Sequence, residues 1–72
     1  MAKQEVREKY APEKVLQTWA TVMQAIVYMN EDELKAALEA ELEGQRRKDI
    51  ILRLHRKFNR LRGEREMKEY TK

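Results

Sequence analysis

The chain has 72 residues, 42% of them apolar and 40% charged, with a net charge of +3 and no cysteine. This length predicts a single helical domain over residues 1–72, near the lower limit for a chain that folds around its own core. The composition excludes disulfides and thiolate metal sites, and it is too apolar for a disordered chain. Stability must come from packing, so binding to a partner or to a second copy is expected.

The sequence also predicts a soluble, cytoplasmic protein with no membrane contact. The N-terminal segment MAKQEVREKY lacks the apolar core of a secretory signal. The longest apolar-rich run, residues 15–29, is interrupted by polar residues and is too short to span a bilayer.

The first predicted helix covers residues 12–29, after an arm formed by residues 1–11. Pro12 suits the first helical turn, and apolar residues then recur at helical spacing over a wide arc. This pattern predicts one continuous helix that is the most buried in the protein and packs across the other two. The candidate interface residues on this helix, for a protein partner or a second copy, are Trp19, Val22, Val27 and Tyr28. Trp19 also fits a core position, and the pattern favours that alternative.

The second predicted helix covers residues 31–43. Asn30 is a favourable N-cap, and Glu33 three residues later completes the pattern of a capping box. Gly44 is expected to end the helix as a left-handed C-cap.

The third predicted helix covers residues 45–68. Leu54, Phe58 and Leu61 recur at steps of four and three, which indicates one buried side. With the second helix it is expected to form an αα-hairpin over residues 31–62. The fold class predicted is therefore all-α, with three helices and a core over residues 12–72.

The outer face of the third helix is basic. Residues 45–72 carry a net charge of +7, whereas residues 31–44 carry −5. The candidate binding residues on this basic face are Arg46, Arg47, Arg53, Arg56, Lys57 and Arg60. Such a face fits phosphate contacts by a dimeric nucleic-acid-binding protein, or charge pairing with the neighbouring acidic helix. A helix-turn-helix motif centred on Gly44 fits poorly, because the flanking positions that should be apolar are Glu39, Glu43 and Gln45.

The sequence does not favour catalysis. It contains neither serine nor cysteine, and its single histidine, His55, lies next to the apolar row and is expected at the core boundary. There is no metal-ligand spacing and no glycine-rich phosphate loop, so we expect no catalytic residue, no cofactor and no metal site.

Residues 29–66, MNEDELKAALEAELEGQRRKDIILRLHRKFNRLRGERE, resemble a pattern in small helical proteins encoded by tailed phages. The pattern is an acidic capped helix, a short basic turn, and then R-L-H-R-x-[FY]-x-x-L-R followed by R-E-R-E-like charge. Proteins of this kind mostly have no assigned role, although some bind host RNA polymerase or DNA. The resemblance implies a host-directed or genome-regulating binder located in the host cytoplasm, and it transfers no functional residue.

These observations predict a non-enzymatic regulatory protein that docks onto another protein, with the host transcription machinery (RNA polymerase) as the first candidate. The alternative is a dimeric nucleic-acid-binding protein that uses the basic face. A virion structural or assembly component is a further alternative. The expected assembly is a homodimer or a subunit of a larger complex.

Overall fold

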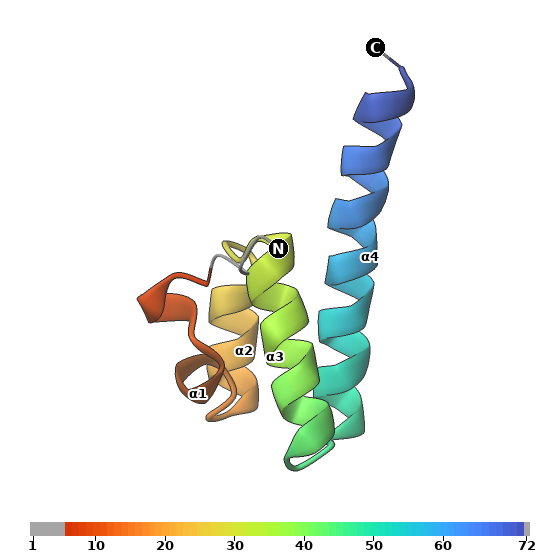
Figure 1. Ribbon diagram of the computed structural model, residues 1–72. Coiled ribbons are helices and arrows are strands. Elements are labelled where there is room, and N and C mark those ends of the chain that lie inside the picture. Colours follow the sequence, from red (N-terminus) through yellow and green to blue (C-terminus); the bar gives the residue numbers. More distant parts are fainter. Residues whose placement is uncertain (1–5, 72) are drawn as a thin grey trace.

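The computed structural model describes residues 6–71 and shows an all-α domain, as the sequence predicts (Figure 1). A short 3-10 helix, η1, covers Glu8–Tyr10. The α-helices are α1 (Pro12–Val15), α2 (Trp19–Ile26), α3 (Glu31–Glu43) and α4 (Lys48–Tyr70). The part of the predicted arm before Val6 lies outside the described residues.

The predicted αα-hairpin is present. Helices α3 and α4 run antiparallel and side by side, and α4 continues well beyond the start of α3 (Figure 1). Gly63 lies within α4 and does not end it, although glycine costs about 1 kcal/mol relative to alanine inside a helix. The last turns of α4 therefore project from the body of the domain.

The turn between α3 and α4 differs from the prediction. Gly44 does end α3, but its φ is −101°, so the expectation of a left-handed glycine there is wrong. Arg46 adopts the left-handed conformation instead, with a φ of 53°. Glycine still suits position 44, because an added Cβ would lie 3.1 Å from the Ala40 carbonyl oxygen. This turn delays the start of α4 to Lys48, three residues after the predicted start.

The prediction of one continuous helix over residues 12–29 is also wrong. The chain leaves the helical conformation near Leu16, and Thr18 is extended, with φ −143° and ψ 168°. The Thr18 hydroxyl accepts a hydrogen bond from the Thr21 backbone N–H at 3.1 Å, and the Thr21 hydroxyl donates to the Val15 carbonyl at 2.7 Å. The two threonine hydroxyls thus form hydrogen bonds with a backbone N–H and a carbonyl that would pair with other backbone groups in a continuous helix. Thr18 thereby acts as the N-cap of a second helix.

The core lies where α1, α2, α3 and the first half of α4 meet. Its buried apolar residues are Val15, Val22, Ile26, Met29, Leu34, Ala37, Ile50 and Leu54. The segment predicted as one helix supplies four of these eight side chains, Val15, Val22, Ile26 and Met29. Trp19, for which the pattern favoured a core position, is instead half exposed. Phe58 and Leu61 of the predicted apolar row pack against the edge of the core.

Candidate docking surface

Two of the predicted basic-face residues belong to the turn after α3. Arg46 donates from Nη1 to the Leu42 carbonyl at 2.9 Å. Arg47 is half-buried and holds the buried carboxylate of Glu41: its backbone N–H and its Nε donate to Oε2 at 2.7 and 2.9 Å, and its Nη2 donates to Oε1 at 2.8 Å. The same Nη2 reaches the Leu16 carbonyl at 2.7 Å, which ties the turn to the end of α1. We call this set of hydrogen bonds the Arg47–Glu41 clamp.

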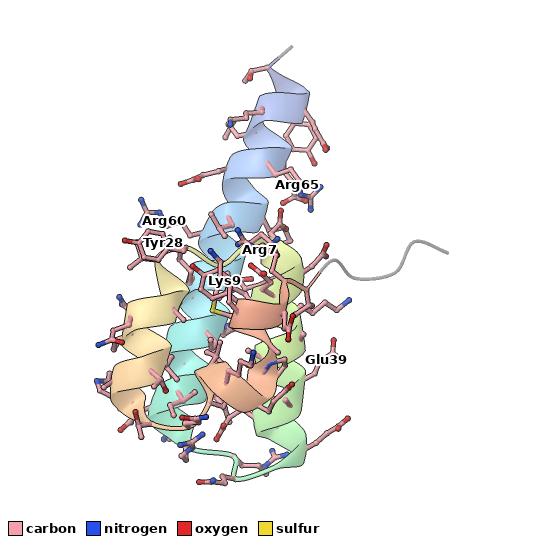
Figure 2. The ribbon with its side chains drawn as sticks, turned by 90° about the vertical axis from the view of Figure 1, so that its left-hand side faces the viewer. Arg7, Lys9, Tyr28, Glu39, Arg60 and Arg65 are labelled. Carbon is pink, nitrogen blue, oxygen red and sulfur yellow. The ribbon has the colours of Figure 1, made fainter. Side chains whose placement is uncertain are left out.

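A second clamp of the same kind joins the N-terminal arm to α3. The backbone N–H and Nε of Arg7 donate to Glu33 Oε2 at 2.9 and 2.8 Å, and Nη2 donates to Oε1 at 2.6 Å and to the Tyr28 carbonyl at 2.7 Å. Glu33 also completes the predicted capping box with Asn30, which is confirmed. Figure 2 shows Arg7 between the arm and the start of α3. Sequence reasoning identified the cap but missed Arg7, because no local spacing links residues 7 and 33.

These clamps lower the pKa of both glutamates. Hydrogen bonds from Arg7 hold the pKa of Glu33 at about 2, against the opposing effect of burial. Hydrogen bonds from Arg47 likewise lower the pKa of Glu41. Among the described residues, no buried side-chain polar atom lacks a hydrogen-bond partner. Both carboxylates are therefore ionised structural groups at neutral pH.

A third arginine pairs α4 with α3 near the start of α3. Arg65 Nε donates to Glu31 Oε2 at 2.8 Å, and this contact raises the pKa of Arg65. Arg47 and Arg65 therefore account for the predicted pairing between the basic and acidic helices. The central part of the basic face does not take part in that pairing.

The remaining predicted cations surround a groove between α2 and α4. We call this site the α2–α4 groove, and its lining residues are Ile26, Val27, Arg53, Arg56, Lys57 and Arg60. Its volume is about 330 Å³, and no carboxylate lines it. Within the part of the chain that the structure describes, Arg53, Arg56 and Lys57 have no carboxylate within 4.0 Å, and Arg60 lies 3.3 Å from the exposed Glu64.

Exposed apolar side chains continue from this groove along α2. Trp19, Met23 and Val27 follow one another at every fourth position and so share one side of the helix. Trp19 and Val27 are both exposed, and Met23 is partly buried against the core. Val27, which lines the groove with the cations of α4, therefore also belongs to this apolar side of α2.

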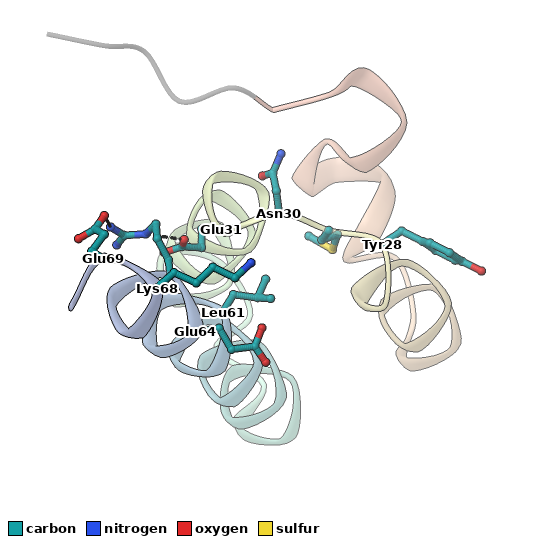
Figure 3. Close-up of a pocket in the computed structure, with 9 residues that line it drawn as sticks. Tyr28, Asn30, Glu31, Leu61, Glu64, Lys68 and Glu69 are labelled. Carbon is teal, nitrogen blue, oxygen red and sulfur yellow. Dashed lines mark hydrogen bonds and ion pairs between the residues drawn. The ribbon is translucent and has the colours of Figure 1, made fainter. Parts of the chain in front are cut away.

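The other predicted interface residues lie elsewhere. Val22 is fully buried in the core, so it is not available to a partner. Tyr28 is exposed but does not line the α2–α4 groove; it lines a second groove of about 550 Å³ together with Met29 and Leu61. In Figure 3, Leu61 and Lys68 point into this groove while the Tyr28 ring points away from it. The structure therefore separates Tyr28 from the α2–α4 groove.

The single histidine of the chain lies at the surface. His55 is exposed rather than placed at the core boundary, and it lies 3.3 Å from the Asn59 amide nitrogen. No group of three potential metal-ligating side chains occurs between Val6 and Thr71. Over the same residues, no helix has the length and apolar character required to cross a bilayer.

Comparison of the chain with known protein families, curated proteins and solved structures gave no match.

Proposed function

We propose that the chain is a non-enzymatic binding protein that docks through the α2–α4 groove onto an acidic segment of another protein. The observation that carries this proposal is the division of the cations of α4 and of the turn before it into two sets. Arg47 and Arg65 are held by glutamates of α3, whereas Arg53, Arg56 and Lys57 have no carboxylate partner among residues 6–71.

The apolar part of the surface favours a protein as the partner. Ile26 and Val27 line the groove between the cations, and the half-exposed Trp19 extends this apolar area. A protein segment that combines carboxylates with an apolar anchor makes both kinds of contact, and tryptophan and arginine are the residues most enriched in binding hot spots. The phosphate groups of a nucleic acid accept contacts from cations and hydrogen-bond donors but offer no apolar surface to Ile26 and Val27.

The resemblance to small phage proteins makes bacterial RNA polymerase the first partner to test. Nucleic acid is the second candidate, because Arg53, Arg56, Lys57 and Arg60 present four cations over two turns of one helix. The two candidates differ in their response to salt. When phosphate contacts carry the binding, the association constant falls steeply with salt, and its logarithm decreases linearly with the logarithm of the salt concentration.

The proposal is tested with purified bacterial RNA polymerase and with duplex DNA, each titrated against the wild type and against the Arg56→Glu/Lys57→Glu variant. Lys35→Glu is the matched control, since Lys35 is exposed on α3 outside the groove. We expect saturable polymerase binding by the wild type and the control. The affinity of the double variant for the polymerase should be at least tenfold lower.

Two results would overturn this assignment. Duplex DNA binding with a steep salt slope, together with no polymerase binding, would establish the nucleic-acid function instead. Polymerase binding that survives Arg56→Glu/Lys57→Glu would show that docking uses another surface. If neither probe binds, a bacterial extract passed over immobilised wild-type, double-variant and control proteins decides the outcome. The docking proposal then fails if no protein is retained selectively by the wild type and the control.

A further inference from the structure

The α2–α4 groove lies between two rows of side chains, one on each helix. The row on α4 is cationic and repeats at steps of three and four residues: Arg53, Arg56, Lys57 and Arg60. The row on α2 is apolar, repeats at every fourth residue and reaches the groove at its last member: Trp19, Met23 and Val27. Because α2 and α4 run in the same general direction (Figure 1), a segment in the groove meets cations on one side and apolar side chains on the other.

Both walls of the groove are helices, and this limits the conformation of a segment that binds there. The backbone groups inside a helix are paired with one another, and residues 6–71 contain no β-strand. The groove therefore presents no strand edge with a row of free backbone donors and acceptors. An extended segment would lose hydrogen bonds to water against the apolar wall without replacing them. A helical segment satisfies its own backbone, as in the helix-in-groove mode of peptide recognition.

The spacing of the cations fits carboxylates carried on a helix. Arg53 and Arg60 are seven residues apart, which corresponds to about 10.5 Å along α4. A helix beside α4 rises by the same distance per residue, so glutamates three, four and seven residues apart on it lie at matching heights. Glu64 contacts Arg60 from the next turn of α4 but does not line the groove. The charge of the groove is thus complementary to a row of carboxylates.

We infer that the partner segment is an amphipathic α-helix that lies lengthwise in the α2–α4 groove. Its row of carboxylates faces the cations of α4, and an adjacent apolar row packs against Val27 and, farther along α2, against the half-exposed Trp19. Trp19 and Val27 are eight residues apart, or about 12 Å, so a helix of two to three turns covers both rows. This inference rests on the proposed docking through the groove and specifies the chemistry and conformation of the partner.

The test uses three synthetic peptides. The first is an acidic peptide of about 14 residues, made of glutamate, leucine and alanine, with glutamates and leucines on two adjacent helical rows. The second has the same charge and leucine content, but central alanines are replaced by proline, which breaks the helix. The third carries lysine in place of every glutamate. Fluorescence anisotropy of the labelled peptides measures binding, and the emission of Trp19, the single tryptophan of the chain, reports contact with the apolar row.

The acidic helical peptide should bind saturably and shift the emission of Trp19. The proline peptide should bind at least about tenfold more weakly, because it cannot form the helix, and the lysine peptide should not bind. Equal binding by the acidic helical peptide and the proline peptide would assign the groove to an extended segment and overturn the inference. Failure of the acidic helical peptide to bind up to its solubility limit would overturn it as well.

A charge swap tests whether the two charged rows face each other. The triple variant Arg53→Glu/Arg56→Glu/Arg60→Glu should lose the acidic peptide and bind the lysine peptide. The three arginines are exposed and form no buried ion pair, so the variant should remain folded. A triple variant that still binds the acidic peptide would show that the peptide occupies another surface.

The matched control changes the net charge by the same amount outside the groove. Lys35→Glu/Lys48→Glu/Lys68→Glu replaces three exposed lysines that do not line it. This control should bind the acidic peptide as the wild type does and should not bind the lysine peptide. If the control and the triple variant behave alike, net charge governs binding, and the facing rows are ruled out.

The helix inference and the docking proposal fail separately. Selective retention of a partner protein through Arg56 and Lys57, together with equal binding of the acidic helical and proline peptides, would leave docking intact and remove only the helix. A dilution series of the chain alone tests a second copy as the occupant. Emission of Trp19 that changes with protein concentration in the wild type, but not in the triple variant, would assign the groove to self-association and overturn the inference.

Discussion

Arg47 holds Glu41 through its backbone and its side chain at once, since the backbone N–H and Nε donate to the same carboxylate oxygen. Arg7 holds Glu33 with the same set of hydrogen bonds. In each clamp Nη2 donates both to the other carboxylate oxygen and to a carbonyl of a distant segment. Two buried glutamates of α3 thereby fix the arm, α1 and the turn into α4 around one helix.

The first prediction concerns the Arg47–Glu41 clamp. Arg47→Met should lower the free energy of unfolding by about 3 kcal/mol, because it leaves a buried carboxylate without its cation. The double variant Arg47→Met/Glu41→Leu should be more stable than Arg47→Met alone, because it removes that uncompensated charge. Urea unfolding of the wild type and the variants measures both effects. A double variant that is less stable than Arg47→Met would show that Glu41 contributes without its partner.

The second prediction is a loss of stability in acid. The pKa of Glu33 falls from 4.5 in the unfolded chain to about 2 in the folded protein. A carboxyl with a lowered pKa contributes its full stability above pH 4.5, and this contribution is lost as the pH falls toward 2. Because Arg7 is half exposed to solvent, we expect the loss to be about 2 kcal/mol.

Urea unfolding at several pH values measures this loss, with Glu33→Gln as the comparison. The variant should be less stable than the wild type at pH 7 and should lose less stability between pH 5 and pH 2. Some pH dependence should persist in the variant, because the pKa of Glu41 is lowered as well. Parallel pH profiles for the two proteins would contradict the role of Glu33.

Several features were predictable from the sequence because their signals are local. The Asn30–Glu33 capping box, the end of α3 at Gly44 and the apolar row of α4 all follow from residues within a few positions of one another. The break at Thr18 was missed because apolar residues continue at helical spacing across it. The periodicity reports which side faces the core and does not report whether the backbone stays helical.

The candidate site was only partly predictable for a different reason. Six basic residues were predicted as one binding face, but the sequence does not indicate which of them pair within the fold. Arg47 pairs with Glu41 only because the left-handed Arg46 turns the backbone N–H of Arg47 toward α3. Arg53 and Arg56 are distinguished by the absence of such contacts within the described part of the chain, which depends on the packed arrangement of the helices.

The third prediction separates free cations from structural ones. The triple variant Arg53→Glu/Arg56→Glu/Arg60→Glu should keep the stability of the wild type to within about 1 kcal/mol, because these residues contribute no buried ion pair. Thermal unfolding measured by circular dichroism provides the comparison. A loss as large as that of Arg47→Met would mean that the central cations pair with α3 after all.

The fourth prediction tests the placement of two valines on α2. Val22 is fully buried and Val27 is 64% exposed. Val22→Glu should unfold the domain, because an unpaired carboxylate would be buried in the core. Val27→Glu should leave the domain folded and weaken docking at the α2–α4 groove. Far-ultraviolet circular dichroism distinguishes the two, and a folded Val22→Glu variant would contradict the core described above.

The fifth prediction concerns Gly63. Gly63→Ala should raise the free energy of unfolding by about 0.5–1 kcal/mol, since alanine favours the helical backbone and its Cβ meets no atom of the fold. The measurement is urea unfolding of the wild type and the variant at the same low micromolar concentration. A larger side chain extends the test: Gly63→Leu should be at least as stable as the wild type, because leucine favours the helix more than glycine does and position 63 is open. A Gly63→Leu variant that is less stable than the wild type in dilute solution would show that the fold itself requires the glycine.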